Sequence, residues 1–152
     1  MRISAKADYA VRAAAELARA AGQGPVRAEE ISKAQRIPLN FLLNILGELK
    51  LARLVQSQRG SQGGYRLARD PERITLAEVI RAVEGPLANV HESRPEELSY
   101  PGPAGPLRDV WIAVRASIRS VLESVTLAHL VSGSLPSSVR RMLKDPDAWV
   151  AR

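Results

Sequence analysis

The chain has 152 residues, of which 45% are hydrophobic and 25% charged, which suits one domain with a core, or a small domain with a dimerisation arm. It has a net charge of +6 and no cysteine, so disulfides, thiolate zinc sites and cysteine-held iron–sulfur clusters are excluded. No apolar run approaches the roughly 18 residues that span a bilayer, and the N-terminus lacks a signal-peptide core. We therefore expect a cytoplasmic protein that does not bind membranes.

The basic charge is concentrated in the first half of the chain. Residues 1–70 contain twelve Lys and Arg against six Asp and Glu, whereas residues 71–152 contain ten of each. Basic surfaces attract phosphate and orient an encounter with nucleic acid. A solvated basic surface would give the same count, so the DNA-binding prediction depends on the motif that this half contains.

Three helices are predicted before a glycine-rich hairpin. The first begins after the N-cap residue Ser4 and ends near Ala21, before two glycines and a proline. The second covers residues 27–35, and Pro38 favours a turn that leads into a third helix over residues 38–51. The core stripe of this third helix is Leu42, Ile45, Leu46 and Leu49.

The opposite face of the third helix carries two asparagines near its N-terminal end. Asparagine can pair with base edges, and the second helix of a helix-turn-helix presents its N-terminal residues to the major groove. The alternative is that both are ordinary polar surface residues. From this helix and the preceding turn we predict DNA contacts by Arg36, Asn40, Phe41, Leu43 and Asn44.

Residues 54–67 predict a hairpin, because two β-prone flanks enclose a loop with three glycines and one arginine. Its place after the helix pair indicates a winged helix-turn-helix. Arg59 is positioned to enter a minor groove, and its polar neighbours can donate to phosphates. A nucleotide phosphate cradle is the rival, but the loop lacks the GK[ST] ending and precedes a strand. The predicted DNA-binding residues of the wing are Ser57, Gln58, Arg59, Gly60, Ser61, Gln62, Gly63 and Gly64.

A fourth helix is expected to begin at the capping box Thr75–Glu78 and to end at Gly85. Residues 86–106 are rich in proline and are expected to form a flexible loop. An apolar stripe then repeats at steps of four and three residues, which predicts one coiled-coil helix over residues 107–131. The stripe is Leu107, Trp111, Val114, Ile118, Val121, Val125 and Ala128.

Such a stripe must be buried against a partner, and its two-fold mate is the natural one, so we predict a homodimer. Packing on the helix's own domain is the alternative. The fold class is therefore mainly α with a small β-hairpin wing. We assign residues 1–85 to a winged helix-turn-helix DNA-binding domain, 86–106 to a sensor-type loop, 107–131 to a dimerisation helix and 132–152 to a C-terminal tail.

Seven short motifs occur from the N-terminus to the end of the fourth predicted helix. They are Met1-Arg2-Ile3-Ser4, Ala7-Asp8-Tyr9-Ala10, Glu30-Ile31, Arg36-Ile37-Pro38-Leu39-Asn40-Phe41-Leu42, Arg59-Gly60-Ser61-Gln62-Gly63-Gly64-Tyr65-Arg66-Leu67, Ile74-Thr75-Leu76 and Val83-Glu84-Gly85. With these motifs the chain resembles the IscR/NsrR/CymR family of bacterial repressors, the Rrf-two family, over roughly residues 1–130. The resemblance implies a homodimeric winged-helix repressor that binds a palindromic operator, with the wing arginine in the minor groove.

The chain departs from this family in its sensor residues. Many members bind an iron–sulfur cluster through three cysteines in the segment that corresponds to residues 86–106, and this chain has none. Some add a carboxylate from the first helix, where this chain has Asp8. Asp8, Arg12 and His91 are thus a candidate sensor region, but we expect no cluster and no other cofactor. A site of oxygen and imidazole ligands alone stays a minor alternative. Arg53 stands where the family commonly has a helix-ending glycine, which predicts a strained turn.

The sequence thus predicts a transcriptional regulator, of repressor type, that is switched by a small molecule or a protein partner such as an enzyme. Its DNA partner is double-stranded. The alternative is a protein-interaction module that regulates an enzyme without binding DNA. We do not expect an enzyme, because the histidines, His91 and His129, fall in a loop and a helix and no catalytic pattern emerges.

Overall fold

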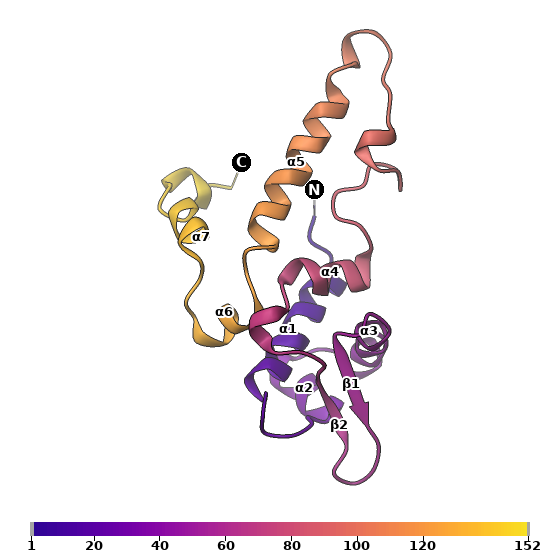
Figure 1. Cartoon of the computed structure of the whole chain (residues 1–152), viewed down its shortest axis with the longest axis vertical. Helices are drawn as coiled ribbons and strands as arrows, with labels where there is room; N and C mark the ends of the chain where they lie inside the picture. The colour runs from indigo at the N-terminus through magenta and orange to yellow at the C-terminus, as the bar shows by residue number, and fades with distance from the viewer. Residues whose placement is uncertain (1, 152) are drawn as a thin grey trace.

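The computed structural model describes residues 2–151 and is mainly helical, with an antiparallel hairpin, as the sequence predicts (Figure 1). Short 3-10 turns occur at Pro71–Arg73 (η1), Pro95–Glu97 (η2), Gly102–Ala104 (η3) and Pro146–Trp149 (η4). The helices and strands are α1 (Ala5–Arg19), α2 (Ala28–Gln35), α3 (Leu39–Leu51), β1 (Val55–Gln58), β2 (Gly64–Leu67), α4 (Leu76–Glu84), α5 (Leu107–Leu122), α6 (Leu127–Ser132) and α7 (Ser137–Met142).

α1 lies at the centre of the core and contacts α2, α3, α4 and α6. Its N-cap is Ser4, whose Oγ accepts a hydrogen bond from the Ala7 N–H. Small side chains on its packed faces allow the neighbouring helices to approach closely. Ala10 and Ala14 are buried, whereas Ala21, near which the sequence predicts the end of this helix, lies beyond it and is exposed. The α3 stripe is buried along its whole predicted length: Leu42, Ile45, Leu46 and Leu49.

The hairpin β1–β2, with its loop, forms the wing, residues 54–67. Val55 pairs with Leu67 at its base, and Gln58 pairs with Gly64 next to the loop. The chain before α2 joins the second strand, because Val26 and Tyr65 exchange backbone hydrogen bonds of 2.8 and 2.7 Å. A Cβ on Gly64 would lie 2.5 Å from the Val26 carbonyl oxygen, so this attachment requires glycine.

Beyond α4 the chain leaves the body and forms an arm, residues 85–122 (Figure 1). Residues 86–106, which we predicted as a flexible loop, run along this arm and contain η2 and η3. η2 packs against α5, and α5 also touches α4. Among residues 2–151, no helix combines the length and the apolar character needed to cross a membrane.

The prediction of one helix over residues 107–131 is wrong. α5 ends at Leu122, and α6 begins after Thr126, whose side chain forms a capping box with His129. Between them Val125 is 4% exposed, and its carbonyl accepts the Leu76 N–H at 2.9 Å. Val125 is therefore buried in its own chain and cannot lie on a dimer seam. Ala128 belongs to α6, so it does not continue the α5 stripe.

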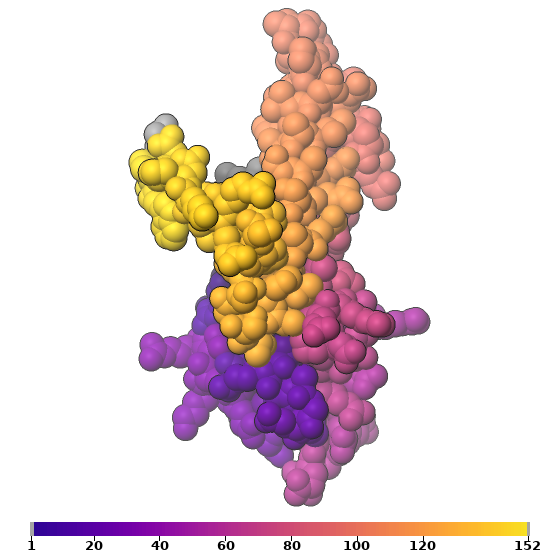
Figure 2. All heavy atoms as spheres, turned by 60° about the vertical axis from the view of Figure 1, so that its left-hand side comes forward, coloured from indigo at the N-terminus to yellow at the C-terminus, as the bar shows by residue number. Residues whose placement is uncertain are grey.

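The C-terminal tail contains α7 and η4, and its end projects to one side of the arm (Figure 2). Trp149 is 72% exposed, and its indole N–H donates to the Leu143 carbonyl at 2.8 Å. This side chain therefore fixes the local turn of the tail and does not attach the tail to the body.

Candidate nucleic-acid interface

The turn between α2 and α3 is held in one conformation by its own residues. Arg36 ends α2 with a left-handed backbone (φ 54°), and the following residue, Ile37, is buried. The Ile37 N–H donates to the Ser32 carbonyl at 3.0 Å, and the Ser32 hydroxyl donates back to the Ile37 carbonyl at 2.6 Å. The Arg36 side chain is therefore directed outward while Ile37 anchors the turn, and α3 begins at Leu39.

The face of α3 opposite its core stripe is open to solvent. Asn40 and Asn44 are exposed, and neither side-chain amide makes a hydrogen bond within residues 2–151. Their donors and acceptors are thus available for base edges. Phe41 and Leu43 lie on the same exposed part of the helix, with 42% and 41% of their surfaces exposed, so they are available for apolar contact with bases.

Arg12 connects α1 to this turn, a role that sequence reasoning missed. Its Nε donates to the Gln35 side chain at 3.2 Å, another nitrogen binds the Gln35 carbonyl, and Nη1 pairs with Asp8 at 3.0 Å. The guanidinium also lies 5.3 Å from the centre of the Tyr9 ring. Tyr9 in turn contacts Phe41 edge to face, with ring centres 5.7 Å apart. These contacts fix α3 relative to α1.

In the wing, the predicted residues divide into two groups. Arg59 and its polar neighbours are exposed at the tip. Gly63 is buried and Gly64 half-buried, so these two serve the backbone geometry. A Cβ on Gly63 would lie 2.2 Å from the Gln58 carbonyl oxygen. The exposed wing residues are Ser57, Gln58, Arg59, Gly60, Ser61 and Gln62.

We use the term reading head for α2, α3, the wing and the turns that join them. Within the part of the chain that the structure describes, six cations of the reading head form no ion pair. Unpaired cations on one surface can neutralise phosphates without losing an existing partner. Four of them were not among the predicted contacts: Lys33, Lys50, Arg53 and Arg66. The complete set is Lys33, Arg36, Lys50, Arg53, Arg59 and Arg66.

The structure does not gather the candidate sensor residues into a ligand cluster. Asp8 and Arg12 belong to the α1 contacts described above, and His91 lies exposed on the arm with a φ of 48°. Among residues 2–151, no group of three or more His, Cys, Asp and Glu side chains could hold a metal ion. The predicted sensor role of these three residues stays a prediction.

Comparisons with known proteins agree with this geometry. Residues 3–133 match the family model Rrf2, described as an iron-dependent transcriptional regulator. A candidate HTH-type transcriptional regulator of Mycobacterium tuberculosis (strain H37Rv) is 49% identical over 145 residues, covering 95% of this chain and 90% of the relative. The HTH-type transcriptional regulator CymR of Bacillus subtilis is 36% identical over 132 residues, covering 87% of this chain and 91% of CymR.

Solved structures give the same result. The structure of CymR, the global cysteine regulator of B. subtilis, has a TM-score of 0.71 and 32% identity, covering 87% of this chain and 97% of that one. T. potens IscR has a TM-score of 0.69 and 34% identity, covering 100% of this chain and 93% of that one. These relatives are named as regulators, in agreement with the prediction that the chain is not an enzyme.

The word iron in the family description does not fit the residues of this chain. Iron–sulfur clusters are held mainly by thiolates, and the sequence contains no cysteine. The arm segment that would carry them offers His91 and carboxylates instead. The helix-turn-helix and the wing, in contrast, lie within the residues 3–133 that match the family model. The chain belongs to the Rrf2 family of helix-turn-helix transcriptional regulators, and its partner is DNA.

Proposed function

We propose that this protein is a homodimeric, cluster-free repressor that binds a palindromic operator in the cytoplasm and is switched by a small molecule or a protein partner. The observation that carries the DNA part of the proposal is the set of six unpaired cations in the reading head, the unit that also contains the exposed Asn40 and Asn44. Phosphate contacts by the cations would position the protein, and the asparagines would read bases.

The dimer part of the proposal is supported by α5. No residue of α5 is fully buried in the single chain. Its stripe of large apolar side chains is half-buried and thus keeps part of its apolar surface in contact with water. Pairing with a second copy would remove more of this apolar surface from water. The residues that stay in the predicted seam are Leu107, Trp111, Val114, Ile118 and Val121.

Switching would follow from an equilibrium between dimer geometries that differ in the spacing of the two α3 helices. An effector moves such an equilibrium only if it binds one geometry more tightly. Repression follows when the operator-binding geometry blocks a promoter. The competing function, an enzyme-binding module without DNA affinity, would leave the reading head's cations without a phosphate partner.

A binding experiment separates these two functions. Operator duplexes are first selected from a randomised pool, and affinity is then measured by fluorescence anisotropy between 50 and 200 mM salt. We expect affinity to fall steeply with salt, because each neutralised phosphate releases counterions. The enzyme-binding module would show neither a selected sequence nor a steep salt dependence.

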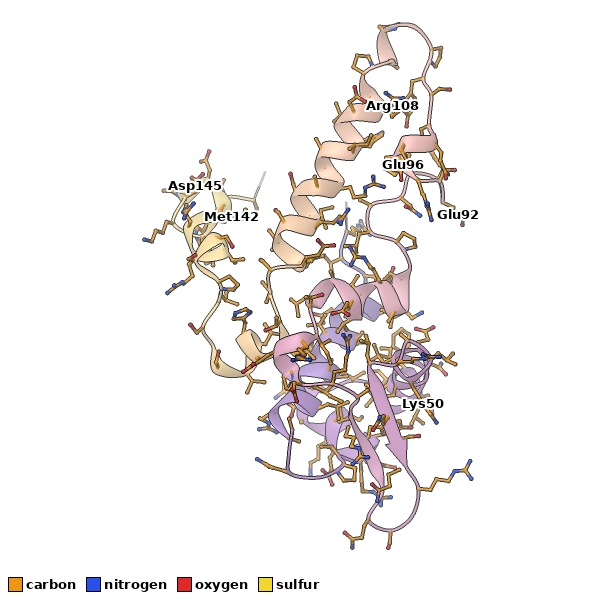
Figure 3. The ribbon with its side chains drawn as sticks, in the orientation of Figure 1. Lys50, Glu92, Glu96, Arg108, Met142 and Asp145 are labelled. Carbon is orange, nitrogen blue, oxygen red and sulfur yellow. The ribbon has the colours of Figure 1, made fainter. Side chains whose placement is uncertain are left out.

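Arg59→Ala is expected to weaken operator binding by about 1–3 kcal/mol. Arg108→Ala is the matched control, because Arg108 lies near the far end of the arm, away from the reading head marked by Lys50 (Figure 3). Equal losses for the two variants, or an unchanged affinity for Arg59→Ala, would remove the wing arginine from the interface.

A further inference from the structure

A cavity of about 470 Å³ lies where α4, the lower arm segment and α5 meet. Four guanidinium groups line it: Arg81 from α4, Arg94 from the arm segment, and Arg115 and Arg119 from α5. Its volume is in the range of small-molecule sites, roughly 300–1,000 Å³. The elements that line it are α4 and the arm, whereas the wing extends from the other end of the molecule (Figure 1).

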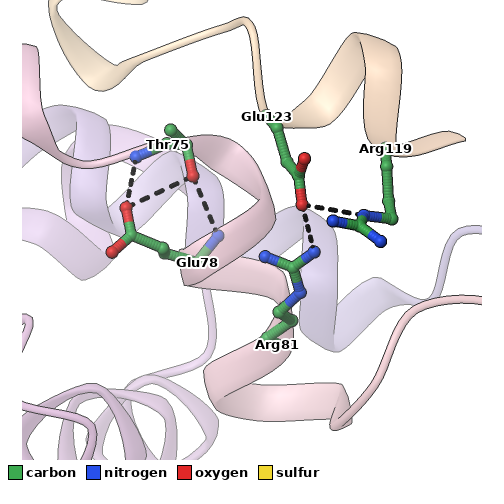
Figure 4. Close-up of polar contacts among 5 residues, drawn as sticks. All are labelled: Thr75, Glu78, Arg81, Arg119 and Glu123. Atoms are coloured by element: carbon green, nitrogen blue, oxygen red, sulfur yellow. Dashed lines mark hydrogen bonds and ion pairs between the residues drawn. The ribbon is translucent and has the colours of Figure 1, made fainter. Parts of the chain in front are cut away.

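The guanidinium groups outnumber the carboxylates around this cavity. Glu96 pairs with Arg115 at 2.7 Å. One oxygen of Glu123 accepts hydrogen bonds from both Arg81 and Arg119 (Figure 4). Arg94 forms no ion pair or side-chain hydrogen bond within residues 2–151. Three of the four guanidinium groups therefore share two carboxylates, and the fourth, Arg94, has no carboxylate partner.

Both carboxylates keep their charge near neutral pH. The pKa of Glu96 is lowered by a hydrogen bond from its own backbone N–H and then by Arg115. The pKa of Glu123 is lowered by its hydrogen bonds from Arg81 and then Arg119. The excess of two positive charges around the cavity is therefore present at physiological pH, when all four arginines are protonated.

We propose that this cavity binds a small organic anion with two or more acidic groups, carboxylate or phosphate, and that this anion is the effector. The effector role rests on the regulator function proposed above, whereas the binding itself does not. A guanidinium presents a fork of donors that matches both acid groups, and several such forks favour a multivalent anion. Pro86 and Leu87 supply apolar wall for its carbon skeleton.

The site has a direct connection to the joint between arm and body. Arg81 and Arg119 line the cavity and also hold Glu123, so a bound anion would compete with Glu123 for them. The backbone between the lining residues Leu87 and Asn89 is strained, because Ala88 has a φ of 56°. Anion binding would thus change the contact between α4 and α5, and an anion that prefers one arm position would shift the dimer geometry.

The binding is tested on the full-length protein without DNA, by isothermal titration calorimetry at fixed ionic strength. Citrate and inorganic pyrophosphate are the probes, and sorbitol is the neutral control. We expect saturable binding of at least one anion, and the tighter of the two identifies carboxylate or phosphate as the preferred group. Absence of saturable binding by both would overturn the proposal.

Two sets of variants locate the site. The double variant Arg94→Gln/Arg115→Gln should bind the anion at least tenfold more weakly. Arg108→Gln, the same change on α5 but outside the cavity, should leave the affinity unchanged. Glu96→Gln should raise the affinity for the anion several-fold, because the substitution removes the carboxylate that pairs with Arg115. Equal weakening by Arg108→Gln, or weakening by Glu96→Gln, would place the anion elsewhere.

The effector role is then tested by adding the bound probe to the operator-binding assay. A change in operator affinity for the wild type that is absent in the Arg94→Gln/Arg115→Gln variant supports it. Anion binding without such a change would leave the site in place and overturn its role as an effector site. Loss of all operator binding, in every buffer, would count against the proposed function and not against the cavity.

Discussion

Arg53 has a left-handed backbone conformation, with a φ of 60°, directly after α3. Its N–H donates to the Lys50 carbonyl, and the Leu54 N–H donates to the Leu49 carbonyl, both at 3.0 Å, which closes the helix end. A non-glycine residue in this conformation costs roughly 1–2 kcal/mol. The strained turn that the sequence predicts at this position is therefore confirmed, and Arg53 carries a backbone cost along with its positive charge.

Replacing Arg53 separates the two effects. Arg53→Gly should raise the free energy of unfolding by about 1 kcal/mol, because glycine removes the strain but adds some freedom to the unfolded chain. Arg53→Ala removes the charge and keeps the strain, so its stability should stay near the wild-type value. Urea unfolding measures both. If alanine stabilised as much as glycine, loss of charge repulsion and not backbone strain would explain the gain.

Residues with local signals could be predicted, and those with distant partners could not. Ser4, Pro38 and the wing glycines determine their own neighbourhoods, so the helix starts and the hairpin followed from the sequence. From the sequence, Arg12 is predicted only as part of a candidate sensor region with Asp8 and His91. Its bonds to Gln35 join residues 23 positions apart, and no pattern in one sequence reveals such a pair.

At the scale of elements, the break between α5 and α6 shows where periodicity misleads. The apolar spacing continues through Val125 and Ala128. Val125 is buried in the segment between the two helices and Ala128 is half-buried in α6, so neither residue extends the α5 stripe. The backbone at Thr126 pairs with that at Thr75, where each threonine caps a helix. The one available signal was Thr126 with His129 three residues later, a weak form of the capping box.

Glu123 makes the joint between arm and body dependent on pH. Its pKa is lowered in the folded protein by Arg81 and then Arg119, so on acidification the unfolded chain takes up the proton first. The stabilisation is thus complete at neutral pH and is lost as pH falls below the ordinary glutamate value of about 4.3. The Glu123→Gln variant has no carboxylate at this position, so its stability should not show this dependence on pH.

Hydrogen exchange of the α5 amides between pH 3.5 and 7, corrected for intrinsic rates, measures this effect. Protection in the wild type should exceed that in Glu123→Gln at pH 7, and the difference should shrink toward pH 3.5. Glu72→Gln on η1 is the control, because Glu72 is exposed and forms no ion pair within the described chain. A wild-type to Glu123→Gln difference that stayed constant with pH would show that Glu123 does not hold the joint by charge.

For the whole molecule, the separation of reading head and arm determines how a signal could reach DNA. The head lies at one end, the arm at the other, and α4 between them touches α1, α3 and α5 (Figure 1). A dimer formed through the arms would set the distance between two heads. Small changes at the α4–α5 contact would then be amplified along the length of each protomer.

The dimer seam can be tested by adding a charge to one face of α5. Val114→Arg places a guanidinium in the half-buried stripe, where a partner helix would have to desolvate it, so we expect a monomer. Ala116→Arg makes the same addition on an exposed face and should remain a dimer. Sedimentation equilibrium measures the mass, and circular dichroism checks that helix content is unchanged.

Operator affinity of the same variants links assembly to function. A monomer engages one half-site, so Val114→Arg should lose at least about 100-fold in affinity for the full operator while it keeps the salt dependence of a single head. Ala116→Arg should bind as the wild type does. If only Ala116→Arg became monomeric, the seam would lie on the opposite face of α5, and if both stayed dimeric, the arm would not form the dimer at all.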